Sequence, residues 1–224
     1  MFDEATTIYS KSVFGGPLIH TNGWGAQITY GKSKTAFKSR IYQLDIVNMR
    51  HPKEIRSLNV QYDETRTYIL GKLNAFFLVR PTIGARNVKF DKIRTTGVAV
   101  GYTWRVGPSL GLLKPVYLEV ITGDGLNEII VVKYDPVEHT ANNIYGRAGG
   151  LRGFNEIEFV PGLHGAFAFN FEYHQKRESI KAIEIGSTVD FFPTGPVNIM
   201  AFAPNQQLFI NFYINLQFGS KFND

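Results

Sequence analysis

The sequence predicts an all-β fold, a closed antiparallel barrel of eight strands, and three observations lead to this prediction. The 224 residues include 18 Phe, 11 Tyr and 22 Gly, a mixture that is typical of strands and turns. Seven segments alternate between apolar and polar side chains with a period of two, as strands with two unlike faces do, and an eighth is rich in β-forming residues. The connections between these segments are alternately short and long. We therefore expect one barrel domain over residues 1–224.

The expected strands follow one another along the chain. The first runs from about Thr6 to Phe14 and is ended by "GGP". In the fourth, Phe76 and Leu78 interrupt the alternation, and the last, "LFINFYINLQFGS", alternates throughout. The seven strands after the first are expected at 21–30, 42–46, 72–80, 98–107, 163–174, 183–191 and 208–220.

The connections indicate how such a barrel would be oriented. Bacterial membrane barrels have short periplasmic turns and long outer loops, and counting back from a periplasmic C-terminus places "GKSKT" and "QKRES" on the periplasmic side. The long connections 50–66 and 114–161 then lie outside, whereas 81–96 is longer than its periplasmic side predicts. Within 114–161, "VYLEVI" and "EIIVVKYD" predict an extended extracellular hairpin with Gly123, Asp124 and Gly125 in its turn. Neither arm alternates strictly, so we expect other loops or a partner protein to cover both faces.

The composition of the two faces favours a membrane barrel over a soluble barrel or sandwich. A mean hydropathy of -0.11 is compatible with this, because only alternate residues of a membrane strand need be apolar. The polar face combines small residues with charges of both signs, which would pair inside a closed barrel. The expected polar network of the lumen is Asp45, Lys72, Asn74, Arg105, Asn170, Glu172, Glu184 and Asp190. The residues expected to face lipid, with aromatic side chains at the interfaces, are Trp24, Tyr30, Tyr42, Trp104, Phe169, Phe171, Tyr173 and Phe212.

The C-terminal strand resembles the signal that outer-membrane barrels present to their insertion machinery, with Phe212, Ile214, Leu216 and Phe218 at alternate positions. More of the chain, through "GGPLIHTNGWG", "RHPKEIRSLN", "GPSLGLLKPVYLEV" and "IYGRAGGLRGFNEI", is similar to a family of small outer-membrane β-barrel proteins from Bacteroidota-type bacteria. This resemblance implies an outer-membrane location and a role as a stand-alone barrel or as a subunit of a larger assembly. The start, "MFDEATTIYS", is not a secretory signal, and we expect one to have been removed.

No residue pattern points to catalysis, a cofactor or a metal. "GPSLG" matches the nucleophile elbow of α/β-hydrolases, but Ser109 continues a strand and Pro115 opposes the helix that this motif requires. His51 with Asp63 and Glu64, and His139 with Asp135 and Glu138, are expected to be solvated loop residues, while His164 and His174 are expected in the lumen or at the rim. Cys is absent, which excludes disulfides and thiolate sites.

We therefore expect a non-enzymatic outer-membrane barrel with a closed lumen that acts as a structural or accessory subunit of an outer-membrane assembly or secretion complex. The expected partners are lipopolysaccharide, phospholipid and other outer-membrane proteins. The net charge of +5 would suit lipid phosphates, and nucleic acid is not expected. Two alternatives remain: a narrow channel past Arg105 and Glu184, and an enzyme at the barrel rim.

Overall fold

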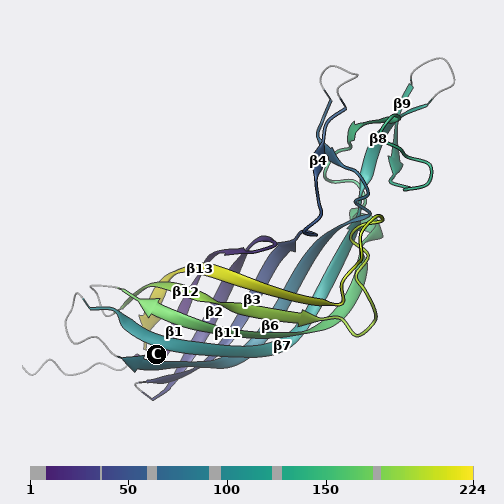
Figure 1. The fold of residues 1–224 in the computed structure, drawn as a ribbon. Coiled ribbons are helices and arrows are strands. Elements are labelled where there is room, and N and C mark those ends of the chain that lie inside the picture. Colours follow the sequence, from purple (N-terminus) through teal and green to yellow (C-terminus); the bar gives the residue numbers. More distant parts are fainter. Residues whose placement is uncertain are drawn as a thin grey trace, which may run out of the picture.

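In the computed structural model, eight antiparallel strands close into a barrel (Figure 1). The structure describes residues 9–35, 37–59, 65–90, 97–122, 128–173 and 178–223. The barrel strands are β1 (Lys11–His20), β2 (Gly23–Thr35), β3 (Lys38–Met49), β6 (Asn74–Phe90), β7 (Ala99–Pro115), β11 (Glu158–Glu172), β12 (Ser179–Phe191) and β13 (Leu208–Phe222). Their order around the wall is β1-β13-β12-β11-β7-β6-β3-β2, and pairing of β1 with both β2 and β13 closes the ring. The predicted eight-stranded antiparallel barrel is confirmed.

Several predicted boundaries were wrong, and two of them lie at a proline. The segment "GKSKT" is not a turn, because β2 continues through it to Thr35 and β3 begins at Lys38. The first strand does not end at "GGP": β1 runs through it to His20, and Pro17 keeps its place opposite Ala26 of β2 while the ladder to β13 skips Gly16 and Pro17. Likewise β6 continues past Pro81 to Phe90, so most of the predicted 81–96 connection is strand. Pro81 pairs with Leu44 of β3, whereas the pairing of β6 with β7 is interrupted at this position. Proline has no N–H to donate, and a strand accommodates it by leaving one side unpaired.

The barrel wall carries apolar side chains on its outer surface. Along β13 the alternate residues from Leu208 to Phe218 point outward, and their exposed fractions range from 42% at Leu216 to 69% at Phe212. At about 3.3 Å per residue and a tilt of about 40°, this stretch rises about 25 Å, the height of the apolar band of membrane barrels. All eight residues predicted to face lipid are exposed, namely Trp24, Tyr30, Tyr42, Trp104, Phe169, Phe171, Tyr173 and Phe212.

The two longest connections between barrel strands form a separate outer unit, which Figure 1 shows rising from one end of the barrel. It contains β4 (Arg56–Ser57), β5 (Tyr68–Ile69), β8 (Tyr117–Thr122), β9 (Glu128–Lys133), β10 (Ile144–Arg147) and the short 3-10 helix η1 (Phe154–Glu156). Among the described residues, no helix is long and apolar enough to cross a membrane. The opposite end of the barrel holds the paired residues Lys11 and Phe222, so the described ends of the chain lie together there.

The predicted hairpin is present, because β8 and β9 pair in antiparallel register from Tyr117 opposite Lys133 to Thr122 opposite Glu128. Its expected turn residues Gly123, Asp124 and Gly125 lie outside the described residues. One face packs against the other long connection in an apolar cluster of Tyr68, Leu118, Val120, Tyr134 and Ile144. On the opposite face Ile129 and Val131 are 46% and 39% exposed. Within the part of the chain that the structure describes, the loops therefore cover one face of the hairpin and leave Ile129 and Val131 exposed on the other, the open face.

Candidate functional site

An apolar plug fills the barrel at the end that carries the outer unit. The segment between β12 and β13, residues 192–207, folds inward, so that Phe192, Ile199 and Met200 are buried. The rings of Phe76, Phe192 and Phe209 pack against one another with centroids 5.7–5.8 Å apart. Phe76 and Leu78, which interrupt the alternation of the sequence, point inward and complete the plug.

Below the plug lies a buried ion pair that crosses the lumen. The guanidinium Nη2 of Arg80 on β6 is 2.7 Å from Oδ2 of Asp190 on β12, and both side chains are at most 2% exposed. The second oxygen of Asp190 is 2.9 Å from Nδ1 of His164 on β11. β6 and β12 are not neighbours in the wall, so this cluster connects strands that the backbone ladder does not join directly.

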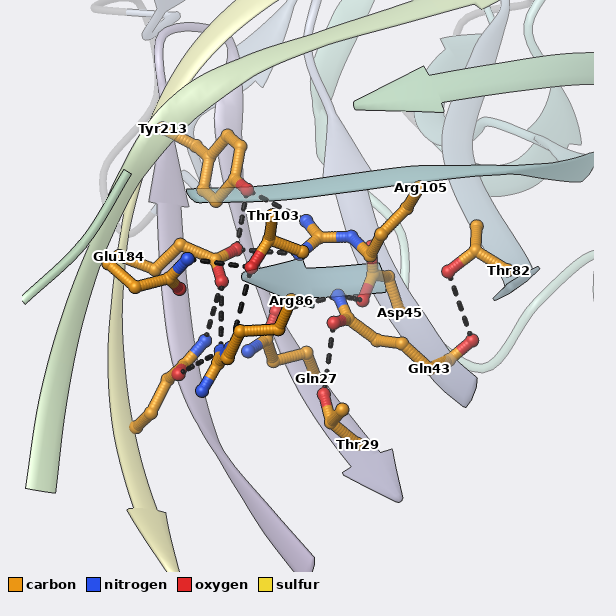
Figure 2. A network of polar contacts seen from close by, with 12 residues as sticks. Gln27, Thr29, Gln43, Asp45, Thr82, Arg86, Thr103, Arg105, Glu184 and Tyr213 are labelled. Atoms are coloured by element: carbon orange, nitrogen blue, oxygen red, sulfur yellow. Dashed lines mark hydrogen bonds and ion pairs between the residues drawn. The ribbon is translucent and has the colours of Figure 1, made fainter. Parts of the chain in front are cut away.

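A larger polar network surrounds Glu184 (Figure 2). Oε1 of this carboxylate lies 2.7 Å from Nη1 of Arg105 and accepts a 2.5 Å hydrogen bond from the hydroxyl of Tyr213. Oε2 is 3.3 Å from Nη2 of Arg86 and accepts from Nε2 of Gln217 at 3.0 Å. Arg105 also donates to Tyr213 at 2.7 Å. One fully buried carboxylate thus pairs with two arginines and is held by four donors.

Gln and Thr side chains, together with Asp45, extend the polar lining toward β2 and β3. Nε2 of Gln43 donates to Asp45 at 2.6 Å and to Gln27 at 2.8 Å, while its Oε1 accepts from Thr29 at 2.9 Å (Figure 2). These residues all occupy inward positions of two adjacent strands. On the far side of the lumen, Asn170 donates to Thr103 at 2.6 Å.

The interior is closed at its lower end as well. Phe14, Ile180 and Ala182 form a buried apolar cluster there, and the guanidinium of Arg86 lies 4.4 Å above the Phe14 ring. Between the two apolar ends, the guanidinium groups of Arg80, Arg86 and Arg105 face the carboxylates of Asp45, Glu184 and Asp190. Positive and negative charges are equal in this set, so the network stabilises a filled lumen without a net charge.

The structure brings together most of the predicted lumen residues. Asp45, Arg105, Asn170, Glu184 and Asp190 lie inside the barrel, and Glu172 lies near its lower end, 2.6 Å from Nζ of Lys221. The prediction was wrong for two residues, which lie at the outer mouth because β6 begins only at Asn74. Lys72 pairs with Glu54 at 2.7 Å, and Asn74 donates to the carbonyl oxygen of Asn198 at 2.8 Å.

The prediction missed Arg86, Gln217 and Tyr213. Arg86 was assigned to the 81–96 connection, although its parity matches that of Arg80 and continues the inward face of β6. Gln217 and Tyr213 share the inward parity of β13, so the alternation alone could have identified them.

The residues examined for catalysis are not arranged as a catalytic site. Ser109 lies within β7, is 2% exposed and faces the lumen, so "GPSLG" is strand and not an elbow. The prediction of a solvated loop residue was wrong for His51, which is buried at the mouth, 3.3 Å from the carbonyl oxygen of Pro204. The ring of His139 accepts from the backbone N–H of Asp135. His174, Asp63 and Glu64 lie outside the described residues. Nowhere in the described ranges do three or more His, Asp or Glu side chains gather as metal ligands would.

A separate polar cluster lies where the outer unit joins the wall. The Tyr117 hydroxyl donates to Glu156 of η1, and Nζ of Lys133 lies 3.1 Å from the same carboxylate. The hydrogen bond from Tyr117 lowers the pKa of Glu156 below its ordinary value, and Lys133 acts in the same direction. The same hydrogen bond raises the pKa of Tyr117. The contact joins β8, β9 and η1 across the open face of the hairpin.

Comparison with known proteins gives similarity to solved structures only. No protein-family model matches the chain, and no curated protein matches it. The fold is similar to that of Neisserial surface protein A, with a TM-score of 0.46 and 10% identity, covering 95% of this chain and 96% of that one. It is also similar to Ail, the attachment invasion locus protein of Yersinia pestis, with a TM-score of 0.42 and 9% identity, covering 96% of this chain and 100% of that one. The resemblance to a Bacteroidota family stays a prediction.

Proposed function

We propose that this chain is an integral outer-membrane β-barrel with a sealed interior, which acts as a non-enzymatic structural or accessory subunit of an outer-membrane protein assembly. One observation carries the proposal: the barrel is inverted relative to a soluble protein. Its charged and polar side chains lie inside, whereas Phe, Ile, Leu and Trp side chains cover the outer wall.

The outer wall supports the membrane location on energetic grounds. Burying one exposed Phe or Leu is worth about 1.5–3 kcal/mol, and apolar residues occupy outward positions on all the barrel strands. A soluble monomer rarely exposes an apolar patch larger than about 300–600 Å². A surrounding hydrocarbon layer removes this surface from water, and the outer band of about 25 Å estimated from β13 fits that layer.

The filled interior supports a structural role over transport. The apolar plug, the two ion-pair clusters and the lower apolar cluster follow one another along the lumen. An eight-stranded barrel has room for little more than its own side chains. The proposal therefore predicts no ion conduction, and planar-bilayer recordings that show steady unitary currents from the purified protein would contradict it.

The outer unit is the part that we assign to partner binding. Its hairpin leaves Ile129 and Val131 exposed on the open face, and β9 is an edge strand of the sheet β10-β8-β9. Exposed apolar residues on an edge strand are unusual in a protein that acts alone, because they invite pairing with another chain.

Affinity purification from native outer membranes in mild detergent, followed by mass spectrometry, tests this role. We expect a stoichiometric companion with the wild type and its loss with Ile129→Asp/Val131→Asp. Val137→Asp is the matched control, because Val137 is also exposed but lies after β9, outside the sheet. Recovery of the wild-type chain without a companion would refute the subunit role.

A further inference from the structure

A pocket of about 580 Å³ lies where the outer unit meets the barrel wall. Its floor comes from outward-facing residues at the upper ends of β3, β6 and β7, including Asn48, Phe77 and Lys114. Its roof and sides come from the two long connections that build the outer unit. A pocket of this size is in the range of small-molecule and headgroup sites, about 300–1,000 Å³.

The pocket lining is strongly basic. Six cationic side chains line it, against the single carboxylate of Glu54: Arg50, Arg56, Lys72, Lys114, Arg147 and Arg152. Glu54 is already 2.7 Å from Nζ of Lys72. Lys72–Glu54 is the one ion pair within the described part of this lining. No described carboxylate lies within 4 Å of the charged groups of the other five cationic side chains. The nearby Glu156 is held by Tyr117 and Lys133.

The local geometry keeps these positive charges together. Nζ of Lys114 donates to the carbonyl oxygens of Gly150 at 2.6 Å and Arg152 at 3.1 Å, which fastens the 149–152 segment to the rim of the barrel. Arg147 lies close enough to Lys114 for the two like charges to repel each other. Like charges held at close range without a counterion favour the binding of an anion. Arginine in particular matches phosphate with two parallel hydrogen bonds.

The pocket continues downward into the apolar outer wall. In the register of β6 and β7, Lys114 lies beside Ala75, Leu112 beside Phe77, and Leu110 beside Val79. All these residues occupy outward positions, so a cationic top stands directly above an apolar ladder. An occupant that satisfies both parts has an anionic head and a hydrocarbon body.

We propose that this pocket binds the phosphate-bearing headgroup of a lipid in the leaflet beside the outer unit, with the acyl chains lying along the Phe77–Leu112 ladder. The inference rests on the proposed membrane location. A free phosphate ion would use the arginines but would leave the apolar ladder without a role, and for this reason the lipid is the occupant.

The test uses the full-length protein in bilayer discs of phosphatidylcholine. Insertion is measured first, by co-flotation of the protein with the lipid. Native mass spectrometry then gives the fraction of protein that retains one molecule of bis-phosphorylated lipid A, of the same lipid A without phosphates, or of inorganic phosphate. The variant is Arg147→Gln/Arg152→Gln, whose exposed side chains make no hydrogen bond or ion pair in the described structure. Arg40→Gln/Lys181→Gln, near the opposite end of the barrel, removes the same charge elsewhere.

We expect the wild type to bind phosphorylated lipid A about tenfold more tightly than the phosphate-free form, since several charge-assisted hydrogen bonds are lost without the phosphates. The pocket variant should lose this preference and the control variant should keep it. Equal binding of the two lipids by an inserted wild type, or a pocket variant that binds like the wild type, overturns the headgroup site alone. Inorganic phosphate that binds by itself and displaces lipid A overturns the lipid as occupant. Failure of the wild type to insert overturns the membrane location and, with it, this site.

Discussion

Glu184→Gln removes the negative charge at the centre of the lumen while it keeps the size of the side chain. The lost contacts are those with Arg105 at 2.7 Å and Arg86 at 3.3 Å. With an effective dielectric constant of about 20, each represents a gross attraction of about 5–6 kcal/mol. Dehydration of the charges offsets much of this, but removal of the carboxylate leaves two buried guanidinium groups without the counterion that both contact. The expected loss is about 3–5 kcal/mol, the range found when one partner of a buried pair is removed.

Urea titration of the protein folded in lipid vesicles measures this loss, with the fluorescence of Trp24 and Trp104 as the signal. Gln217→Ala is the control, because it removes a 3.0 Å hydrogen bond to the same carboxylate and a 2.7 Å hydrogen bond from Arg86 without changing the charge. That control should lose about 1–3 kcal/mol of the free energy of unfolding, which is about 0.5–1.5 kcal/mol for each of the two hydrogen bonds. If Glu184→Gln destabilises no more than Gln217→Ala, the interior charges are solvated and the lumen is not closed as described.

Three further predictions concern the wall, the plug and the outer unit. Phe169→Arg places a charge on the outer wall and should lower the free energy of unfolding in lipid vesicles by about 2–4 kcal/mol. Asn170→Ala loses one hydrogen bond in the lumen and should lower it by about 1 kcal/mol, and equal losses would contradict the inverted barrel. Phe192→Ala should cost about 3–5 kcal/mol and speed proteolysis between β12 and β13, and unchanged cleavage would argue against the plug. Because the hydrogen bond from Tyr117 lowers the pKa of Glu156, the contact is complete above the ordinary pKa of this carboxyl and is lost as the pH falls through the lowered value. Hydrogen exchange in η1, corrected for the intrinsic pH dependence of amide exchange, should increase over that acid range. The increase should be smaller in Tyr117→Phe, where only the contact with Lys133 is left to lose, and an equal increase would contradict the role of Tyr117.

Period-two alternation was sufficient to predict seven of the eight strands and their outer faces, whereas the first strand was predicted from its β-forming residues. It succeeded because each strand separates two unlike environments, so one parity stays apolar along its length. The same signal was misread where the interior itself becomes apolar. Phe76 and Leu78 interrupt the alternation of a polar face, and in the structure they pack against residues 192–207, which are distant in sequence. No local pattern reports that residues 192–207 fold into the barrel.

Strand ends were harder to predict than strand centres. Pro17 and Pro81 are strong local signals for a break, but each is tolerated because a barrel strand can leave one of its two ladders unpaired. Arg86 was therefore missed, since it follows Pro81. The basic pocket was also beyond the sequence, because Arg50, Lys114 and Arg147 meet only through the packing of separate loops.

The positions of the interior charges along the chain bear on how the barrel assembles. The three interior arginines belong to β6 and β7, whereas Glu184 and Asp190 arrive with β12, near the end of the chain. A partly built wall that lacks its last strands would enclose cations with Asp45 as the main counterion, and hydrocarbon strongly disfavours such a state. Closure around a smaller set of strands is thus penalised until the C-terminal third is in place. The interior charges therefore favour closure of the barrel with all eight strands over closure with fewer.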